Sequence, residues 1–131
     1  MNKILITGVT KGLGRETAIW FAKKNFKLIL VGRNERDLKK LHNQLHNKKN
    51  HNILCLDLQK PDQINNIDIR KKIFNGLDRI IHCAGGGLGI KSPLLNYDEF
   101  LSLLNLNFLS LVQINNKFMP ILKKKGGRII H

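Results

Sequence analysis

The sequence predicts an α/β fold: a doubly wound parallel β-sheet with helices on both faces, in three αβα layers. Two observations predict it. Short stretches that are apolar throughout alternate with longer stretches of helical periodicity, and such strands are typical of a parallel sheet that is buried on both faces. In addition, a cluster of glycines follows the first apolar stretch, in the sequence ILITGVTKGLG at residues 4–14, where a strand would lead into a helix.

The expected elements alternate regularly along the chain. Strands are predicted at residues 3–7, 27–32, 52–57 and 77–83, and a fifth strand begins within GGRIIH at 126–131. A first helix is predicted at 13–24, and Asn25 would end it in a left-handed conformation. A second helix would begin after Asn34 as its N-cap, with Leu38, Leu41 and Leu45 facing inward. A weaker helix is predicted at 62–74, and a long one from about 98 to 125. Right-handed crossovers then favour the strand order 3-2-1-4-5.

Composition fits one globular domain. The chain has 131 residues, of which 42% are hydrophobic, and can bury a single core. No repeat, low-complexity tract or linker divides it, so residues 1–131 are expected to form one domain. The net charge of +14 is also found in nucleic-acid binders, but the lysines are scattered and no nucleic-acid-binding motif accompanies them. We therefore expect no specific nucleic-acid partner.

Cysteine usage and hydropathy indicate the compartment. Cys55 and Cys83 lie far apart without paired spacing, which favours reduced thiols over a disulfide framework or a zinc site. His42 and His46 have the spacing of a metal-binding pair on a helix, but no third ligand is near in sequence, and we expect a solvated pair and no metal. No apolar run has the length of a signal peptide core or a membrane span. A cytoplasmic protein without a membrane partner is expected.

The glycine cluster has the chemistry of a phosphate-binding turn. Gly8, Gly12 and Gly14 lie between the first strand and the first helix, where free backbone N–H groups and the helix dipole favour a phosphate and a side chain would block its approach. Leu13 stands where a Walker loop needs glycine, and the spacing also differs from G-x-G-x-x-G. The turn therefore belongs to a different class of phosphate-binding loop.

The pattern T-G-x-x-x-G-x-G, which begins at Thr7, resembles the cofactor loop of the short-chain dehydrogenase/reductase family. Three further motifs agree in order across the whole chain: Asp57-Leu58 after the third strand, Cys83-Ala84-Gly85 in place of the family's usual Asn-Ala-Gly, and Asn107 upstream of Pro120. The resemblance implies a Rossmann-like fold, a nicotinamide dinucleotide cofactor, and hydride transfer between the nicotinamide and a small carbonyl or alcohol substrate.

The resemblance also implies the site. Cofactor-binding residues would be Thr7, Gly8, Thr10, Lys11, Gly12, Leu13, Gly14, Arg33, Asp57, Leu58, Cys83, Ala84 and Gly85. The loop at 84–93 would lie at the carboxyl edge of the sheet, where ligands bind in this architecture. Asn107 would be the catalytic residue that helps to hold a proton-relay water. Alternatively, Cys83 is an ordinary small buried residue that takes the place of the family's asparagine and has no role of its own in the site.

The family's catalytic serine and its Tyr-x-x-x-Lys pair are missing. The one tyrosine, Tyr97, is followed four positions later by Leu101. The chain is therefore interpreted as the amino-terminal portion of a longer, homo-oligomeric enzyme, truncated after the fifth strand and inactive by itself. We expect Leu104, Phe108 and Leu111 to be exposed, and the resulting apolar patch to promote aggregation.

Cofactor choice depends on the end of the second strand. Gly32 stands where an acidic residue would bind the ribose 2′-hydroxyl of NAD. Arg33 and Lys11 are cations suited to a 2′-phosphate, although Arg33 also has the simpler interpretation of a solvated turn residue. NADP is therefore preferred, with NAD as the alternative cofactor. Two other function classes stay open: a non-catalytic dinucleotide-binding module or regulatory subunit, and a basic nucleic-acid-binding protein.

Overall fold

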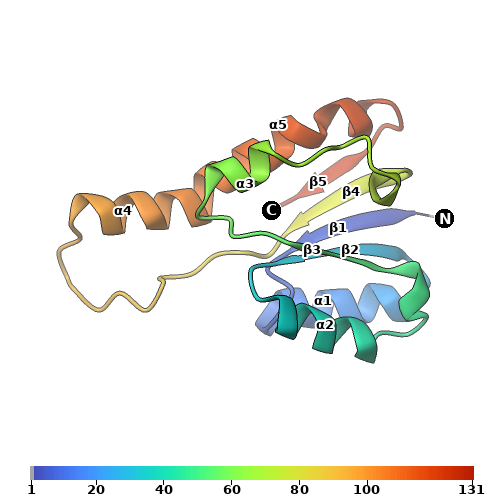
Figure 1. Ribbon diagram of the computed structural model, residues 1–131, viewed down its shortest axis with the longest axis horizontal. Coiled ribbons are helices and arrows are strands. Elements are labelled where there is room, and N and C mark those ends of the chain that lie inside the picture. Colours follow the sequence, from blue (N-terminus) through green and yellow to red (C-terminus); the bar gives the residue numbers. More distant parts are fainter. Residues whose placement is uncertain (1) are drawn as a thin grey trace.

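A parallel five-stranded sheet forms the centre of the computed structural model, which describes residues 2–131 (Figure 1). Its strands are β1 (Lys3–Thr7), β2 (Lys27–Gly32), β3 (Asn52–Cys55), β4 (Leu77–His82) and β5 (Arg128–Ile130), in the order β3-β2-β1-β4-β5. All neighbouring strands are parallel. The predicted fold class and strand order are therefore confirmed.

Helices cover both faces of the sheet (Figure 1). On one face lie α1 (Gly12–Lys23) and α2 (Glu35–Gln44), and on the other lie α3 (Pro61–Asn65) and α5 (Ser110–Lys123). Successive residues of the central strands point to opposite faces. In β1, Leu5 packs against the α3 and α5 side, whereas Ile4 and Ile6 pack against the α1 and α2 side. This explains why the central strands are apolar throughout.

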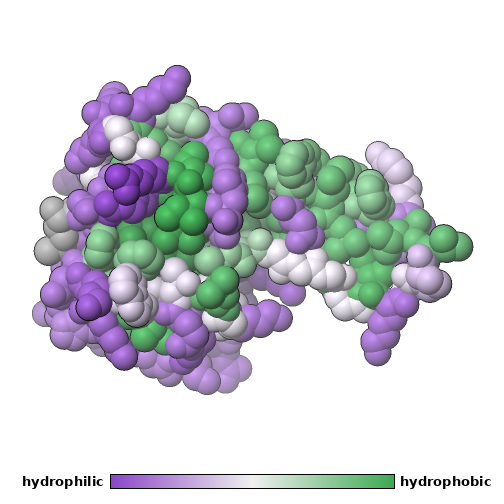
Figure 2. Space-filling model, turned by 180° about the vertical axis from the view of Figure 1, so that it is seen from behind, coloured by the Kyte–Doolittle hydropathy of each residue, from purple (hydrophilic) through white to green (hydrophobic). Residues whose placement is uncertain are grey.

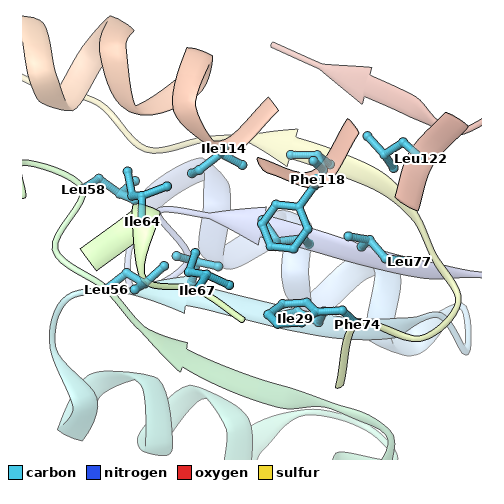
Figure 3. Packing of buried hydrophobic residues seen from close by; sticks show 13 residues of the cluster. Ile29, Leu56, Leu58, Ile64, Ile67, Phe74, Leu77, Ile114, Phe118 and Leu122 are labelled. Atoms are coloured by element: carbon cyan, nitrogen blue, oxygen red, sulfur yellow. The ribbon is translucent and has the colours of Figure 1, made fainter. Parts of the chain in front are cut away.

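The larger core cluster joins the sheet to α5 and to the segment between β3 and β4 (Figure 3). Phe74 and Phe118 are both fully buried, with ring centroids 5.0 Å apart. On the other face, Leu38, Leu41 and Leu45 are buried as predicted. Burying each such side chain contributes roughly 1.5–3 kcal/mol.

Two helix ends follow the predicted signals, and a third has a capping box that was not predicted. Asn34 caps α2 by accepting a hydrogen bond from the backbone N–H of Asp37 at 3.0 Å, and Asn25 has a φ of 62° directly after α1. Asn96 and Glu99 form a capping box at the start of α4 (Tyr97–Leu104). Such reciprocal bonds satisfy N–H groups that lack partners in the first helical turn.

The weak helix predicted at 62–74 is wrong in extent. Only α3 and a short 3-10 turn, η2 (Lys72–Phe74), are helical there. Between them, the Asp68 carboxylate accepts a hydrogen bond from the backbone N–H of Arg70 at 3.1 Å. Such local side-chain bonds compete with a helix, and Ile67 and Ile69 add β-branched residues that disfavour one.

Two predicted strands are slightly too long. β3 ends at Cys55 rather than residue 57: the N–H of Leu56 still donates to the Gly32 carbonyl oxygen of β2 at 2.8 Å, and the N–H of Asp57 then donates to the side chain of Gln63 at 2.8 Å. β4 ends at His82 rather than residue 83, because the N–H of Cys83 donates to the Thr7 hydroxyl at 3.2 Å. At the end of β4 a side-chain oxygen of β1 thus takes the place of a main-chain acceptor.

The long predicted helix contains an irregular turn. The chain is helical from Tyr97 to Lys123, but a π-helical turn, η3 (Asn105–Leu109), separates α4 from α5. A π-helical turn accommodates an extra residue and changes the direction of the side chains around it.

Helix α4 projects from the body of the molecule (Figure 1) and contains no buried residue. Figure 2 shows apolar side chains gathered on this projecting part. Phe108 is 57% exposed, as expected, but Leu104 and Leu111 are half-buried, so the predicted exposure is correct only in part. Tyr97 and Phe100 add to the exposed apolar surface.

The predicted solvated histidine pair is also correct only in part. His46 is exposed, but His42 is half-buried and its Nε2 lies 3.0 Å from the His51 carbonyl oxygen. Residues 2–131 contain no cluster of three or more side chains able to hold a metal ion. Within the same residues, no helix is both long and apolar enough to cross a lipid bilayer.

Candidate functional site

The turn between β1 and α1 contains glycines of two kinds. A Cβ on Gly8, whose φ is +68°, would lie 2.6 Å from the Cα of Ala84, and a Cβ on Gly14 would overlap the carbonyl oxygen of Gly8. These two glycines are required by the packing of the protein itself. Gly12 also has a positive φ of +58°, but nothing lies within 4 Å of its Cβ position. At Gly12 the main chain is therefore open to a ligand.

The start of α1 has the electrostatic character of an anion site. Its N-cap residue, Lys11, provides no side-chain hydrogen bond, and no acidic residue lies in the first turn. The N–H groups of the first turn of a helix lack intrahelical partners, and the helix dipole favours negative charge next to them. The open main chain at Gly12 adjoins these groups.

Thr7 connects the ends of β1 and β4. It is fully buried, and its hydroxyl oxygen accepts hydrogen bonds from the N–H groups of Cys83 and Ala84, both at 3.2 Å. Through these bonds Thr7 fixes the relative position of the glycine turn and the loop that follows β4. Its side chain thus positions the surroundings of the site.

A cleft of about 790 Å³ opens between the glycine turn and the carboxyl ends of β2, β3 and β4. All the residues predicted to bind a cofactor line this cleft, except the buried Thr7. The structure therefore brings together the predicted residues from four separate parts of the chain. The cleft is also lined by Gly32, where the sequence places the choice of cofactor, and by Gly86, Gly87 and Gly89 of the predicted loop at 84–93. Sequence reasoning did not name the remaining lining residues, Leu56, Gln59, Leu88 and Leu106.

The chain after β3 is held in place by side chains. Gln63 accepts a hydrogen bond from the N–H of Asp57 at 2.8 Å, and a carboxylate oxygen of Asp57 accepts one from the N–H of Gln59 at 3.0 Å. Leu58 is buried beneath this turn. The half-buried Asp57 is therefore fixed beside the cleft.

The end of β2 is tightly packed around Gly32. A Cβ on Gly32 would lie 3.1 Å from a methyl carbon of Thr10 and 3.2 Å from one of Leu38. An acidic side chain at this position would have to displace them. By contrast, Arg33 and Lys11 are exposed, line the cleft, and form no ion pair within residues 2–131.

Asn107 lies in the π-helical turn and is bound to the loop after β4. Its Oδ1 accepts a hydrogen bond from the N–H of Gly86 at 2.8 Å, and its Nδ2 donates to the carbonyl oxygens of Gly86 and Leu103, both at 2.9 Å. A Cβ on Gly85 would lie only 2.9 Å from the same Oδ1. The carboxamide is thus engaged with main-chain atoms on both of its sides.

Two titratable side chains lie at the end of β4. Burial raises the pKa of the half-buried Cys83 thiol, opposed by a hydrogen bond with Thr17. Burial also lowers the pKa of His82, whose Nε2 lies 2.8 Å from Oδ1 of Asn115. Sequence reasoning did not single out His82, because its partner lies on a distant helix and no motif includes it.

Comparisons with known proteins agree on one family. Residues 2–131 match the family described as short chain dehydrogenase. An uncharacterized oxidoreductase of Staphylococcus aureus is 26% identical over 129 residues, which is 97% of this chain and 55% of the relative. An NADP-dependent 3-hydroxy acid dehydrogenase of Schizosaccharomyces pombe is 31% identical over 128 residues, which is 94% of this chain and 49% of the relative.

A solved structure shows the same arrangement. The short-chain dehydrogenase of Sphingobium yanoikuyae in complex with NADPH superimposes with a TM-score of 0.85 at 25% identity, covering 98% of this chain and 52% of that one. The chain thus spans about half the length of the relatives it matches. None of these comparisons favours a regulatory module or a nucleic-acid binder. Together with the glycine turn and the strand order, they show that the chain belongs to the short chain dehydrogenase family.

Proposed function

We propose that this chain provides the cofactor-binding part of an oxidoreductase that uses a nicotinamide dinucleotide, NADP in preference to NAD. The observation that carries the proposal is the open main chain at Gly12, where α1 begins and the cleft lies beside it. A diphosphate next to this turn would accept hydrogen bonds from main-chain N–H groups and lie at the positive end of the helix dipole.

The residues around the cleft suit the remaining parts of a dinucleotide. Asp57 and Leu58 would contact the adenine, while Ala84 and Gly85 would lie along the diphosphate and the adjoining ribose. The bound nicotinamide would supply or accept a hydride, with a carbonyl or alcohol compound as the substrate. The role of Asn107 as a catalytic residue that holds a water remains a prediction.

Preference for NADP rests on charge and space. Gly32 lacks the acidic side chain that would bind a free ribose 2′-hydroxyl, and a Cβ there would lie tightly against Thr10 and Leu38. Arg33 and Lys11 both line the cleft, and a guanidinium and an ammonium group form charge-assisted hydrogen bonds with a phosphate. The NADP dependence of the yeast relative and the NADPH bound to the Sphingobium structure support the same choice.

Fluorescence titration with NADPH and NADH tests the proposal. The Gly12→Ala variant should weaken NADPH binding by about tenfold or more, because its methyl group occupies the space needed by the diphosphate. Gly126→Ala is a matched control, because Gly126 has a φ of +62° and nothing within 4 Å of its Cβ position, but lies outside the cleft. Circular dichroism would verify that both variants fold.

Two results would overturn the proposal. One is a folded wild-type chain that binds neither coenzyme. The other is an equal effect of the two alanine substitutions, which would show that only backbone strain, and not obstruction of a ligand, is responsible for any loss.

A further inference from the structure

A second hollow adjoins the dinucleotide cleft beyond the carboxyl end of β3. It has a volume of about 630 Å³ and is lined by Arg33, Cys55, Leu56, Asp57, Lys60, Gln63 and Asn66. Arg33, Leu56 and Asp57 also line the dinucleotide cleft. The two hollows are therefore adjacent at the end of β2, where the cationic Arg33 belongs to both.

The second hollow has an excess of positive charge. Arg33 and Lys60 provide two cations against the single carboxylate of Asp57, and one oxygen of that carboxylate already accepts the N–H of Gln59 at 3.0 Å. Neither cation forms an ion pair within the part of the chain that the structure describes. Both are thus available to an anion.

The backbone of Lys60 is held in a defined position. Its N–H donates to the carbonyl oxygen of Asp57 at 3.0 Å, and its own carbonyl oxygen accepts from the N–H of Gln63 at 3.1 Å. Pro61 follows it directly and restricts the residue before it to an extended conformation, which agrees with the φ of −109° and ψ of 95° at Lys60. The flexible ammonium group therefore extends from a fixed point on the rim.

We propose that Lys60 is a specificity-determining residue that selects NADPH over NADH. The inference rests on the proposed function: at the junction of the two hollows, Lys60 would join Arg33 and Lys11 in binding the 2′-phosphate. A phosphate monoester carries close to two negative charges at neutral pH, so a further cation adds to the bidentate contact that arginine offers. NADH has only a hydroxyl group there and gains nothing from Lys60.

Coenzyme titration of matched variants provides the first test. At low salt, Lys60→Gln should raise the Kd for NADPH roughly twofold to fivefold and leave the Kd for NADH nearly unchanged. Lys71→Gln removes the same charge from an exposed lysine outside both hollows and should change neither Kd. Arg33→Gln should lower the preference for NADPH as well.

The outcomes separate this inference from the proposed function. If the wild-type chain bound neither coenzyme, the proposed function would fail. If Arg33→Gln lowered the preference for NADPH but Lys60→Gln and Lys71→Gln behaved alike, the role of Lys60 alone would be refuted.

Cysteine protection gives an independent test. Cys55 is exposed and lines the second hollow, whereas Cys83 lines the dinucleotide cleft. Alkylation followed by peptide mass spectrometry should show that NADPH slows modification of Cys55 more than NADH does, while both coenzymes protect Cys83 equally. Equal modification rates of Cys55 with the two coenzymes would show that the phosphate does not reach this hollow, and would overturn the proposal.

Discussion

Asn107 pairs with the main chain of Gly86 through two hydrogen bonds. Its Oδ1 accepts the N–H at 2.8 Å and its Nδ2 donates to the carbonyl oxygen at 2.9 Å. Because Asn107 lies in the π-helical turn between α4 and α5, these bonds attach the long helix to the loop that borders the cleft. The conformation of that loop therefore depends on a residue outside the cleft lining.

Replacing Asn107 with aspartate should loosen this connection. The carboxylate can still accept from the Gly86 N–H, but it has no donor for the carbonyl oxygens of Gly86 and Leu103. We expect the free energy of unfolding to fall by about 1–2 kcal/mol, measured by urea denaturation. The control is Asn116→Asp, an exposed position on α5. Equal stability of the two variants would show that the pairing does not contribute.

Much of the fold follows from features that are local in the sequence. Apolar strands separated by helices and right-handed crossovers determine the order of the sheet, and the glycine spacing identifies the turn at 8–14. The interruption at Asn105–Leu109 was not predicted, because one extra residue hardly disturbs apolar periodicity over a long helix. The hydrogen bonds that fix the turn join Thr7 to the chain after β4. Residues so far apart in the sequence form no local sequence pattern, so these bonds could not be predicted.

Thr7 provides a sharp test of those long-range contacts. Thr7→Val keeps the shape of the side chain but removes the oxygen that accepts the N–H groups of Cys83 and Ala84. Because Thr7 is fully buried, these groups would lose their partner, at a cost of about 1–3 kcal/mol in the free energy of unfolding. Thr7→Ser, which retains the hydroxyl, should recover most of this loss. An unchanged free energy of unfolding in Thr7→Val would show that these two hydrogen bonds do not contribute to stability.

The buried His51 predicts a dependence of stability on pH. Its Nδ1 accepts the N–H of Leu28 at 3.2 Å and its Nε2 lies 2.8 Å from the carbonyl oxygen of His46, an arrangement that requires the neutral ring. Burial lowers the pKa of His51, and the nearby His42 and His46 lower it further, against the opposing effect of the His46 hydrogen bond. In the unfolded chain the ring takes up a proton near its ordinary pKa of about 6.5.

The sign of the effect follows from proton binding. As the pH falls below about 6.5, the unfolded state binds the proton first, so the free energy of unfolding decreases. His51→Gln offers an acceptor and a donor without titrating, and should flatten this decrease in thermal unfolding measured between about pH 7 and 5. A smaller slope should remain, because burial also lowers the pKa of His82. An unchanged slope in His51→Gln would contradict the assignment.

The exposed apolar surface around α4 and η3 should bind other apolar surfaces. Phe100 on α4 and Phe108 in η3 are 56% and 57% exposed. Figure 2 shows apolar side chains gathered on the projecting part of the molecule. Contiguous patches of this kind favour association. Changing both residues to serine should reduce anilinonaphthalene sulfonate fluorescence and light scattering at high protein concentration.

The control variant is Trp20→Ser on α1. Trp20 is 54% exposed, but the Lys24 ammonium group lies 5.7 Å from its ring centroid. Its replacement should therefore have little effect on the fluorescence or the scattering. An equal decrease in both variants would show that total exposed aromatic area, rather than this patch, governs association.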